Sequence, residues 1–103
     1  LMQVVGGNWS HVGLSGADLT RAIVRDTRLR EADFSRVRCQ DGSIRDADLS
    51  GADFAGADFT DCDLRGSDLS SLDPAVARLK GAIIDMQQAL SLVQAMGLDV
   101  RAD

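Results

Sequence analysis

An apolar residue recurs at every fifth position through most of this chain. Counting in steps of five from Val4 to Ile84 gives seventeen positions, of which sixteen are apolar and only Pro74 departs from the pattern. A second, mostly small residue lies two positions before each of them, and the residue between the two is often Asp. A period of five fits neither the turn of an α-helix nor the alternation of a strand. Self-similarity at one fixed period indicates a repeat architecture.

Two inward-facing residues in every five are compatible with a chain that turns a corner every five residues. Four such corners close a square coil of about twenty residues, and successive coils stack with strand-like hydrogen bonds at about 4.8 Å spacing. Each repeat then contacts only its neighbours, as in a solenoid. We therefore expect an all-β solenoid over residues 1–84 with about four coils, in which core ladders join residues twenty positions apart, such as Val24, Ile44 and Leu64.

The repeat stops after Ile84 and a helical pattern replaces it. Asp85 is expected to cap a helix over residues 86–96, with Gln88 completing a capping box and Gly97 ending the helix. The helix has more apolar residues than a lid over one coil needs. We expect residues 85–103 both to cap the solenoid and to form a homodimer across a two-fold axis. The expected dimer contacts are Met86, Leu90, Leu92, Val93, Met96 and Leu98.

The repeats resemble those of a known family. Runs such as Ala47-Asp48-Leu49-Ser50-Gly51 and Ala52-Asp53-Phe54-Ala55-Gly56 are similar to the pentapeptide-repeat motif A-(D/N)-L-x-x, and the resemblance extends over residues 2–84. This resemblance implies a right-handed quadrilateral β-helix.

The C-terminal segment narrows the resemblance to one group within that family. Residues 72–74, 79–81, 85–89 and 96–98 are similar to the C-terminus of the Qnr and MfpA proteins. Those proteins bind DNA gyrase, protect it from quinolones and dimerise through a C-terminal helix. The resemblance implies an acidic rod that mimics duplex DNA and has gyrase, or a related type II topoisomerase, as its partner. Members of that group have more coils, which leaves open that this chain is a C-terminal portion.

Outward-facing Asp residues form the candidate partner surface. Columns of carboxylates at about 4.8 Å give a regular negative field, as the closer-spaced charges of B-DNA do. The alternative is that Asp at this place in the repeat serves turn formation and solubility. The candidate residues are Asp33, Asp53, Asp73, Asp48, Asp68 and Asp58.

The charge balance limits other partners. The chain has 11 Lys and Arg against 16 Asp and Glu, for a formal net charge of −5, which disfavours direct binding to nucleic acid. Arg25, Arg45 and Arg65 fall in register on one face, either in surface ion pairs with Asp26 and Asp46 or as an anion or partner contact. The alternative to the DNA mimic is a protein without a topoisomerase partner. It would be a structural or protein-interaction β-helix rod, or an appended repeat domain.

No motif indicates catalysis, a metal site or a cofactor. The single histidine, His11, lies at an outward corner, and Cys39 and Cys62 fall in inward columns as small core residues. No stretch approaches the ~18 apolar residues that span a bilayer, and no signal peptide is evident. The expectation is a cytoplasmic, non-enzymatic protein without membrane contact.

Overall fold

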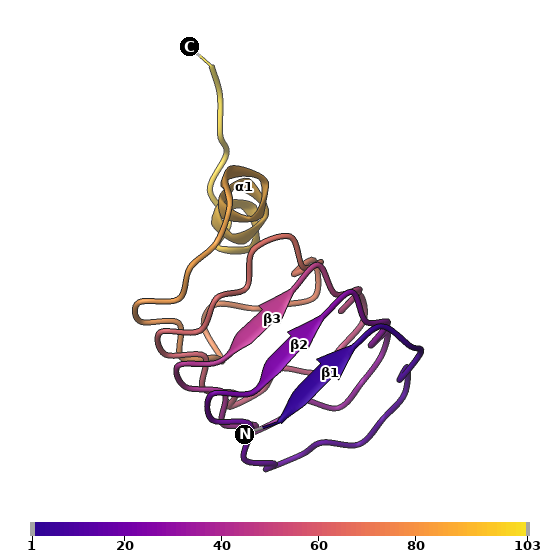
Figure 1. The fold of residues 1–103 in the computed structure, drawn as a ribbon. Helices are drawn as coiled ribbons and strands as arrows, with labels where there is room; N and C mark the ends of the chain where they lie inside the picture. The colour runs from indigo at the N-terminus through magenta and orange to yellow at the C-terminus, as the bar shows by residue number, and fades with distance from the viewer. Residues whose placement is uncertain (1, 103) are drawn as a thin grey trace.

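Strand pairing at a spacing of twenty residues organises the chain. In the computed structural model, which describes residues 2–102, three short parallel strands stack on one face of a solenoid (Figure 1). They are β1 (Gln3–Val5), β2 (Ile23–Arg25) and β3 (Ser43–Arg45). Val4 pairs with Val24, which pairs with Ile44. The twenty-residue coil expected from the sequence is therefore confirmed.

The other faces are joined by single bridges with the same spacing. Asp18 bridges to Arg38, Arg38 to Asp58, and Asp58 to Arg78. Further bridges link Asn8 to Arg28 and Gly13 to Asp33 on the two remaining faces. Because a corner interrupts the chain every five residues, most of the solenoid consists of such bridges rather than long strands.

Tight turns form the corners on these other faces. The carbonyl oxygen of Leu14 accepts a hydrogen bond of 2.9 Å from the N–H of Ala17, and Gly16 between them has a φ of 71°. A positive φ at the third residue is typical of a type II turn. The same conformation recurs at five-residue intervals, even at non-glycine residues such as Asp41, where φ is 57°. The corners that the repeat predicts are therefore formed by left-handed residues.

Side chains fill the axis of the solenoid. Phe34 and Phe54 stack with their ring centroids 5.9 Å apart, and Phe54 meets Phe59 edge to face at 5.8 Å. Cys39 and Cys62 are fully buried free thiols with their sulfur atoms 3.7 Å apart, as expected of small core residues. Hydrogen bonding to Cys39 and burial raise the pKa of the Cys62 thiol, so Cys62 favours its uncharged form.

The register slips by one residue at Pro74. The carbonyl oxygen of Asp73 accepts a hydrogen bond of 3.1 Å from Val76, so this corner comes one residue earlier than the repeat predicts. Proline favours the second position of a turn because its φ is fixed. The expectation that core ladders join residues twenty positions apart is therefore wrong at this corner. The register recovers by Arg78, which again bridges to the residue twenty positions earlier.

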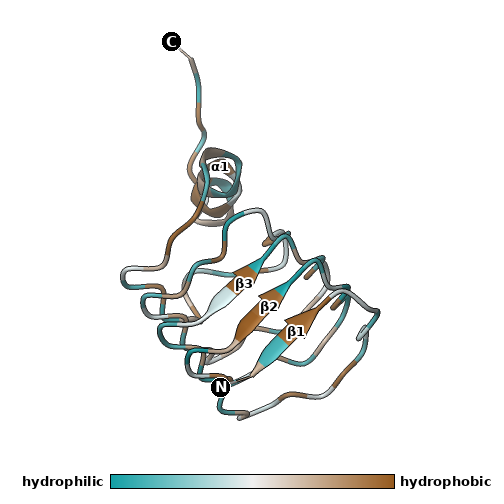
Figure 2. Ribbon diagram, in the orientation of Figure 1, coloured by the Kyte–Doolittle hydropathy of each residue, from teal (hydrophilic) through white to brown (hydrophobic). Residues whose placement is uncertain are grey.

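One helix, α1 (Met86–Ala95), lies over the C-terminal end of the solenoid. Asp85 and Gln88 form the expected capping box, and the helix ends one residue before the expected position. Gly97, with a φ of 86°, follows the helix, and the chain then extends away from the body (Figure 1). Figure 2 shows that the three strands and α1 each carry both apolar and polar residues. Within residues 2–102, no helix has the length and apolar character required to cross a membrane.

Candidate functional site

The candidate carboxylates all make the same local contact. A side-chain oxygen of Asp33 accepts a hydrogen bond of 2.9 Å from the backbone N–H of Ser35, and Asp53 accepts one of 3.0 Å from Ala55. This Asx arrangement stabilises the corner that follows each Asp. It occurs at all six residues predicted for the partner surface, namely Asp33, Asp48, Asp53, Asp58, Asp68 and Asp73. Turn formation therefore accounts for Asp at these positions.

Hydroxyl groups strengthen several of these contacts. Thr60 Oγ1 donates a hydrogen bond of 2.6 Å to Asp58, and Ser50 Oγ donates one of 2.7 Å to Asp48. These hydroxyl donors, together with the backbone N–H groups of the same residues, lower the pKa of the Asp58 and Asp48 carboxyls. Hydrogen bonds to the ionised form favour it. Both side chains are therefore anionic at neutral pH and held in place by the turn.

Asp33, Asp53 and Asp73 are spaced twenty positions apart, and the column that this spacing predicts is interrupted. Asp33 and Asp53 bridge to each other, but no bridge joins Asp53 to Asp73 among the residues that the structure describes. In an unbroken ladder, the carbonyl oxygen of Ala52 would accept the N–H of Asp73. It accepts the hydroxyl of Ser71 instead, at 2.9 Å. The slip at the following proline therefore displaces Asp73 from the predicted column.

Cations lie among the carboxylates. A guanidinium nitrogen of Arg38 lies 3.6 Å from a carboxylate oxygen of Asp18, and Nε of Arg30 lies 3.7 Å from a carboxylate oxygen of Asp48. Asp58 lies between two arginines in the ladder of its face, since it bridges to Arg38 on one side and Arg78 on the other. Residues 1–84 contain thirteen acidic and ten basic side chains. The surface of the solenoid is therefore a mixture of charges with a small negative excess.

The predicted arginine column is in register but differs in its ion pairing. Arg25 and Arg45 are neighbours in the parallel pairing of β2 with β3. Arg65 forms two hydrogen bonds with Asp63, of 3.0 and 2.7 Å, and these raise the pKa of the Arg65 guanidinium. The alternative of ion pairs with Asp26 and Asp46 is not seen in the part of the chain that the structure describes, where both Asp residues occupy left-handed corner positions.

Helix α1 has two unlike sides. Leu92 packs against the core of the solenoid, so this expected dimer residue contributes to docking the helix. Met86 is 83 % exposed and Leu90 is 46 % exposed, and both share one side of the helix with Val93, which is half-buried. Met96 and Leu98 are exposed at the end of the helix. We call the exposed apolar line formed by Met86, Leu90, Val93 and Met96 the α1 ridge.

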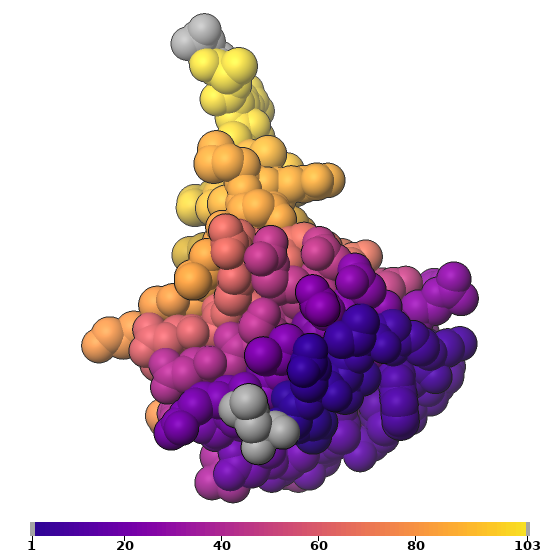
Figure 3. All heavy atoms as spheres, viewed as in Figure 1, coloured from indigo at the N-terminus to yellow at the C-terminus, as the bar shows by residue number. Residues whose placement is uncertain are grey.

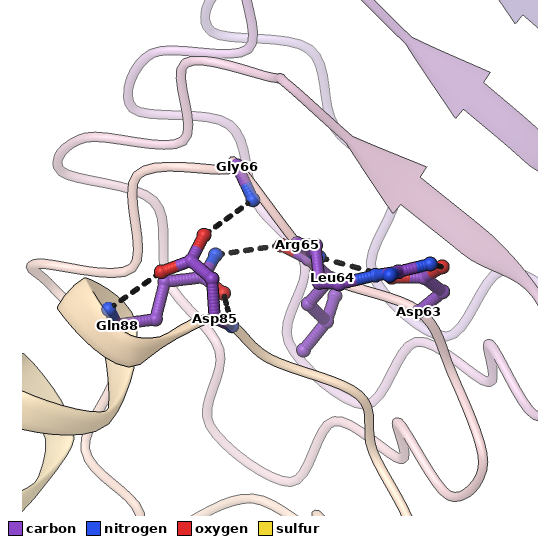
Figure 4. A network of polar contacts seen from close by, with 6 residues as sticks. All are labelled: Asp63, Leu64, Arg65, Gly66, Asp85 and Gln88. Carbon is purple, nitrogen blue, oxygen red and sulfur yellow. Dashed lines mark hydrogen bonds and ion pairs between the residues drawn. The ribbon is translucent and has the colours of Figure 1, made fainter.

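Two polar side chains hold the opposite side of α1 on the last coil (Figure 4). Gln88 Nε2 donates hydrogen bonds of 2.6 Å to the Leu64 carbonyl and 2.7 Å to the Ser67 carbonyl. Asp85 accepts the N–H of Gly66 at 2.9 Å as well as the N–H of Gln88, and these two donors lower the pKa of the Asp85 carboxyl. The sequence indicated the capping box but not the carbonyl contacts of Gln88, because the residues that end the ladder could not be identified from the pattern.

A hollow of about 380 Å³ lies between the last coil and α1. Its lining includes Ser67, Asp68, Asp85 and Ser91, and it has no histidine or cysteine. Within residues 2–102, no three His, Cys, Asp or Glu side chains are arranged to hold a metal ion. Besides this hollow, the described surface consists of the mixed charges of the solenoid and the α1 ridge.

Comparison with known proteins relates these features to a family. The family model for pentapeptide repeats matches 8 copies, over residues 6–36, 14–51 and 32–70. The crystal structure of alr5209, a pentapeptide repeat protein from Nostoc PCC 7120, is 33 % identical over 76 % of this chain and 64 % of that protein, with a TM-score of 0.72. No curated protein matches the chain.

A second relative is HetL, a pentapeptide repeat protein involved in heterocyst differentiation regulation in the same cyanobacterium. It is 27 % identical over 80 % of this chain and 37 % of its own length, with a TM-score of 0.60. The chain therefore spans about two thirds of the first relative and about a third of the second. QnrB1, a plasmid-mediated fluoroquinolone resistance protein, is only 21 % identical, with a TM-score of 0.38.

The family match, the corner geometry and the twenty-residue register all indicate the same fold. The fold is the right-handed β-helix expected from the repeats. The likeness to QnrB1 is too distant to assign the gyrase-protecting group. The chain belongs to the pentapeptide-repeat family.

Proposed function

We propose that this chain is a non-catalytic structural and interaction protein, a β-helix rod of about four coils whose α1 ridge pairs with a second copy across a two-fold axis. The observation that carries the proposal is the 83 % exposure of Met86 on a helix whose other side is already docked on the solenoid. Solvent-exposed apolar side chains gathered in one place mark interaction surfaces.

The absence of charge on the helix supports a second copy as the partner. Residues 86–98 contain no Asp, Glu, Lys or Arg, although a surface helix usually carries charges on its solvent side. Two identical ridges can therefore approach without like-charge repulsion. Pairing would remove Met86, Leu90 and Met96 from water, which is favourable in proportion to the apolar area buried.

Light scattering over a dilution series tests this proposal. The wild-type protein should exceed the monomer mass at high concentration, and Leu90→Asp should weaken association at least about tenfold because it places a charge in an apolar contact. Val76→Asp is the matched control, since Val76 is 45 % exposed on the solenoid rather than on α1. A wild-type protein that stays monomeric throughout, or a Leu90→Asp variant with unchanged mass, would contradict the proposal.

Gyrase binding has less support than this interaction role. The candidate carboxylates form corners, arginines lie between them, and the Asp33–Asp53 column does not continue to Asp73. The interaction role requires none of these carboxylates to face a partner. A gyrase supercoiling assay separates the two hypotheses: protection from a quinolone by this protein would favour the DNA mimic.

A further inference from the structure

Two arginines lie side by side on the strand face of the solenoid. β2 and β3 pair in parallel, and their register places Arg25 next to Arg45. The central residues of the two strands, Val24 and Ile44, are buried, so both arginines point outward. Figure 3, in the orientation of Figure 1, shows that α1 and the tail lie beyond the end of the solenoid and leave this face uncovered. Both guanidinium groups are therefore in solvent, one coil apart.

Neither arginine has a carboxylate partner within residues 2–102. The ion pairs of this part of the chain are made by other arginines, namely Arg30, Arg38, Arg65 and Arg101. The remaining outward residues of β2 and β3 are Ile23 and Ser43, which carry no charge. Like charges directly opposite each other destabilise the pairing of two strands. An anion bound between Arg25 and Arg45 would remove this repulsion.

Carboxylates near the pair are occupied or directed elsewhere. Asp63, in the coil that follows β3, accepts hydrogen bonds from the Arg65 side chain with both of its oxygens (Figure 4). Asp46 comes directly after β3 at a left-handed corner, and its carboxylate lies over Gly66 of the next coil, away from β2. Asp26 occupies the equivalent corner after the end of β2. No carboxylate of β2 or β3 faces the two arginines.

The number of guanidinium groups indicates the kind of anion. A carboxylate has two oxygens, which suffice for one guanidinium, as the contact of Arg65 with Asp63 shows. A tetrahedral dianion such as phosphate has oxygens for a second guanidinium, and arginine recognises phosphate through paired, charge-assisted hydrogen bonds. Arginines on strands about 4.8 Å apart can reach the same phosphate group.

We propose that Arg25 and Arg45 form a binding site for a phosphate group, supplied as free orthophosphate or by a phosphorylated side chain of another protein. Each guanidinium donates N–H groups to the phosphate oxygens, and the dianion neutralises the two neighbouring charges. The site is limited to these two arginines. Val5, on the other side of Arg25, is neutral, and Arg65, in the coil after Arg45, is held by Asp63. The site lies on the solenoid, so it does not depend on the α1 ridge.

Urea unfolding in sodium phosphate and in sodium chloride, at the same pH and ionic strength, tests the site. A ligand that binds only the folded state raises its stability. Phosphate also stabilises folded proteins in general, so the comparison between variants carries the test. The variants are Arg25→Gln, Arg45→Gln and the two combined. Arg21→Gln is the matched control, since Arg21 is exposed, lies outside the pair and loses the same charge.

The wild type and Arg21→Gln should gain the same stability from phosphate, and the double variant should gain less. In a phosphate titration followed by the arginine Nε–H resonances, the double variant should bind at least about tenfold more weakly than the wild type. In chloride, the double variant should be at least as stable as the wild type, because the repulsion between the two arginines is removed.

An equal gain from phosphate in the wild type and the double variant would overturn the proposal. So would an equal loss of phosphate binding in Arg21→Gln, which would assign the effect to net charge. A double variant that is less stable than the wild type in chloride would also overturn it, since the arginines would then stabilise the protein without an anion.

A short peptide with one phosphoserine distinguishes the two sources of the phosphate group. Tighter binding of this peptide than of orthophosphate would assign the site to a side chain of a partner protein. Equal or weaker binding would assign it to free phosphate. The unphosphorylated peptide is the control, and its binding to the wild type as tightly as the phosphopeptide would contradict a phosphate site.

Discussion

Gln88 Nε2 lies 2.6 Å from the carbonyl oxygen of Leu64, so a buried glutamine on the helix completes the hydrogen bonds of the last coil. The same amide nitrogen also reaches the Ser67 carbonyl at 2.7 Å. The Leu64 carbonyl also accepts the N–H of Ser67 within its own corner at 3.2 Å, whereas the Ser67 carbonyl lies at the end of the ladder and receives no backbone donor among the described residues. A single side chain thus caps the edge that every solenoid has to cover.

Replacing Gln88 tests this capping role. Gln88→Leu should lower the free energy of unfolding by about 1–3 kcal/mol, because the Ser67 carbonyl loses its donor and the Leu64 carbonyl loses one of two donors. Urea unfolding measures the loss, and hydrogen exchange should show α1 exchanging faster while residues 22–45 stay protected. Gln94→Leu is the control, since Gln94 is exposed on the same helix. An equal loss for both variants would contradict the capping role.

Gly42 occupies an inward position that holds alanine in several other repeats, such as Ala22 and Ala47, and its surroundings explain the difference. A Cβ atom there would lie 2.8 Å from the sulfur of Cys39 and 3.1 Å from the Ala22 carbonyl oxygen. Gly42→Ala should therefore cost about 1–3 kcal/mol through overpacking. A double-mutant cycle with Cys39→Ala, read by chemical denaturation, should recover part of this cost because the smaller side chain frees space. Additive effects would show that the sulfur does not limit this site.

The hydroxyl donors to the corner carboxylates predict a specific dependence of stability on pH. The Thr60 hydroxyl lowers the pKa of Asp58 in the folded state, so its stabilisation is present above the ordinary Asp value of about 3.9 and is lost as the pH falls through the lower folded value. Thr60→Val should reduce stability at pH 7 and reduce the acid-dependent loss. Denaturation from pH 7 to 2 measures both effects.

Thr27→Val is the matched control for this pH dependence. The Thr27 hydroxyl donates to the Arg25 carbonyl rather than to a carboxylate. The effect of this substitution should therefore be the same at every pH. Parallel pH profiles for Thr60→Val and wild type would contradict the role assigned to the Thr60 hydroxyl.

The repeat pattern predicted the coil because each repeat specifies both its core residues and its corner. Inward positions such as Leu49 and Cys62 are fully buried where the five-residue spacing places them. The slip at Pro74 was not predicted, because counting every fifth residue treats all corners alike. A proline at the second position of a turn instead moves the corner by one residue.

The candidate surface was harder to predict than the fold. An outward Asp satisfies the same pattern whether it binds a partner or an N–H of its own corner, and only the structure shows the contact of Asp33 with Ser35. Leu92 and Leu90 are both apolar residues of one helix. Only the packing of α1 on the solenoid shows that Leu92 faces the core and Leu90 faces solvent.

In the proposed function, the carboxylates stabilise corners while the α1 ridge makes the contact between copies. Asparagine can replace the Asp residues at their corners, because Asn8 already accepts the N–H of Ser10 in the equivalent place. A triple variant with Asp33→Asn, Asp53→Asn and Asp73→Asn therefore removes three charges and retains the turns.

Sedimentation equilibrium on this triple variant, on Leu90→Asp and on the wild type compares the two surfaces directly. The triple variant should associate with the wild-type affinity, and Leu90→Asp should associate at least about tenfold more weakly. Loss of association in the triple variant, with Leu90→Asp unchanged, would contradict the account.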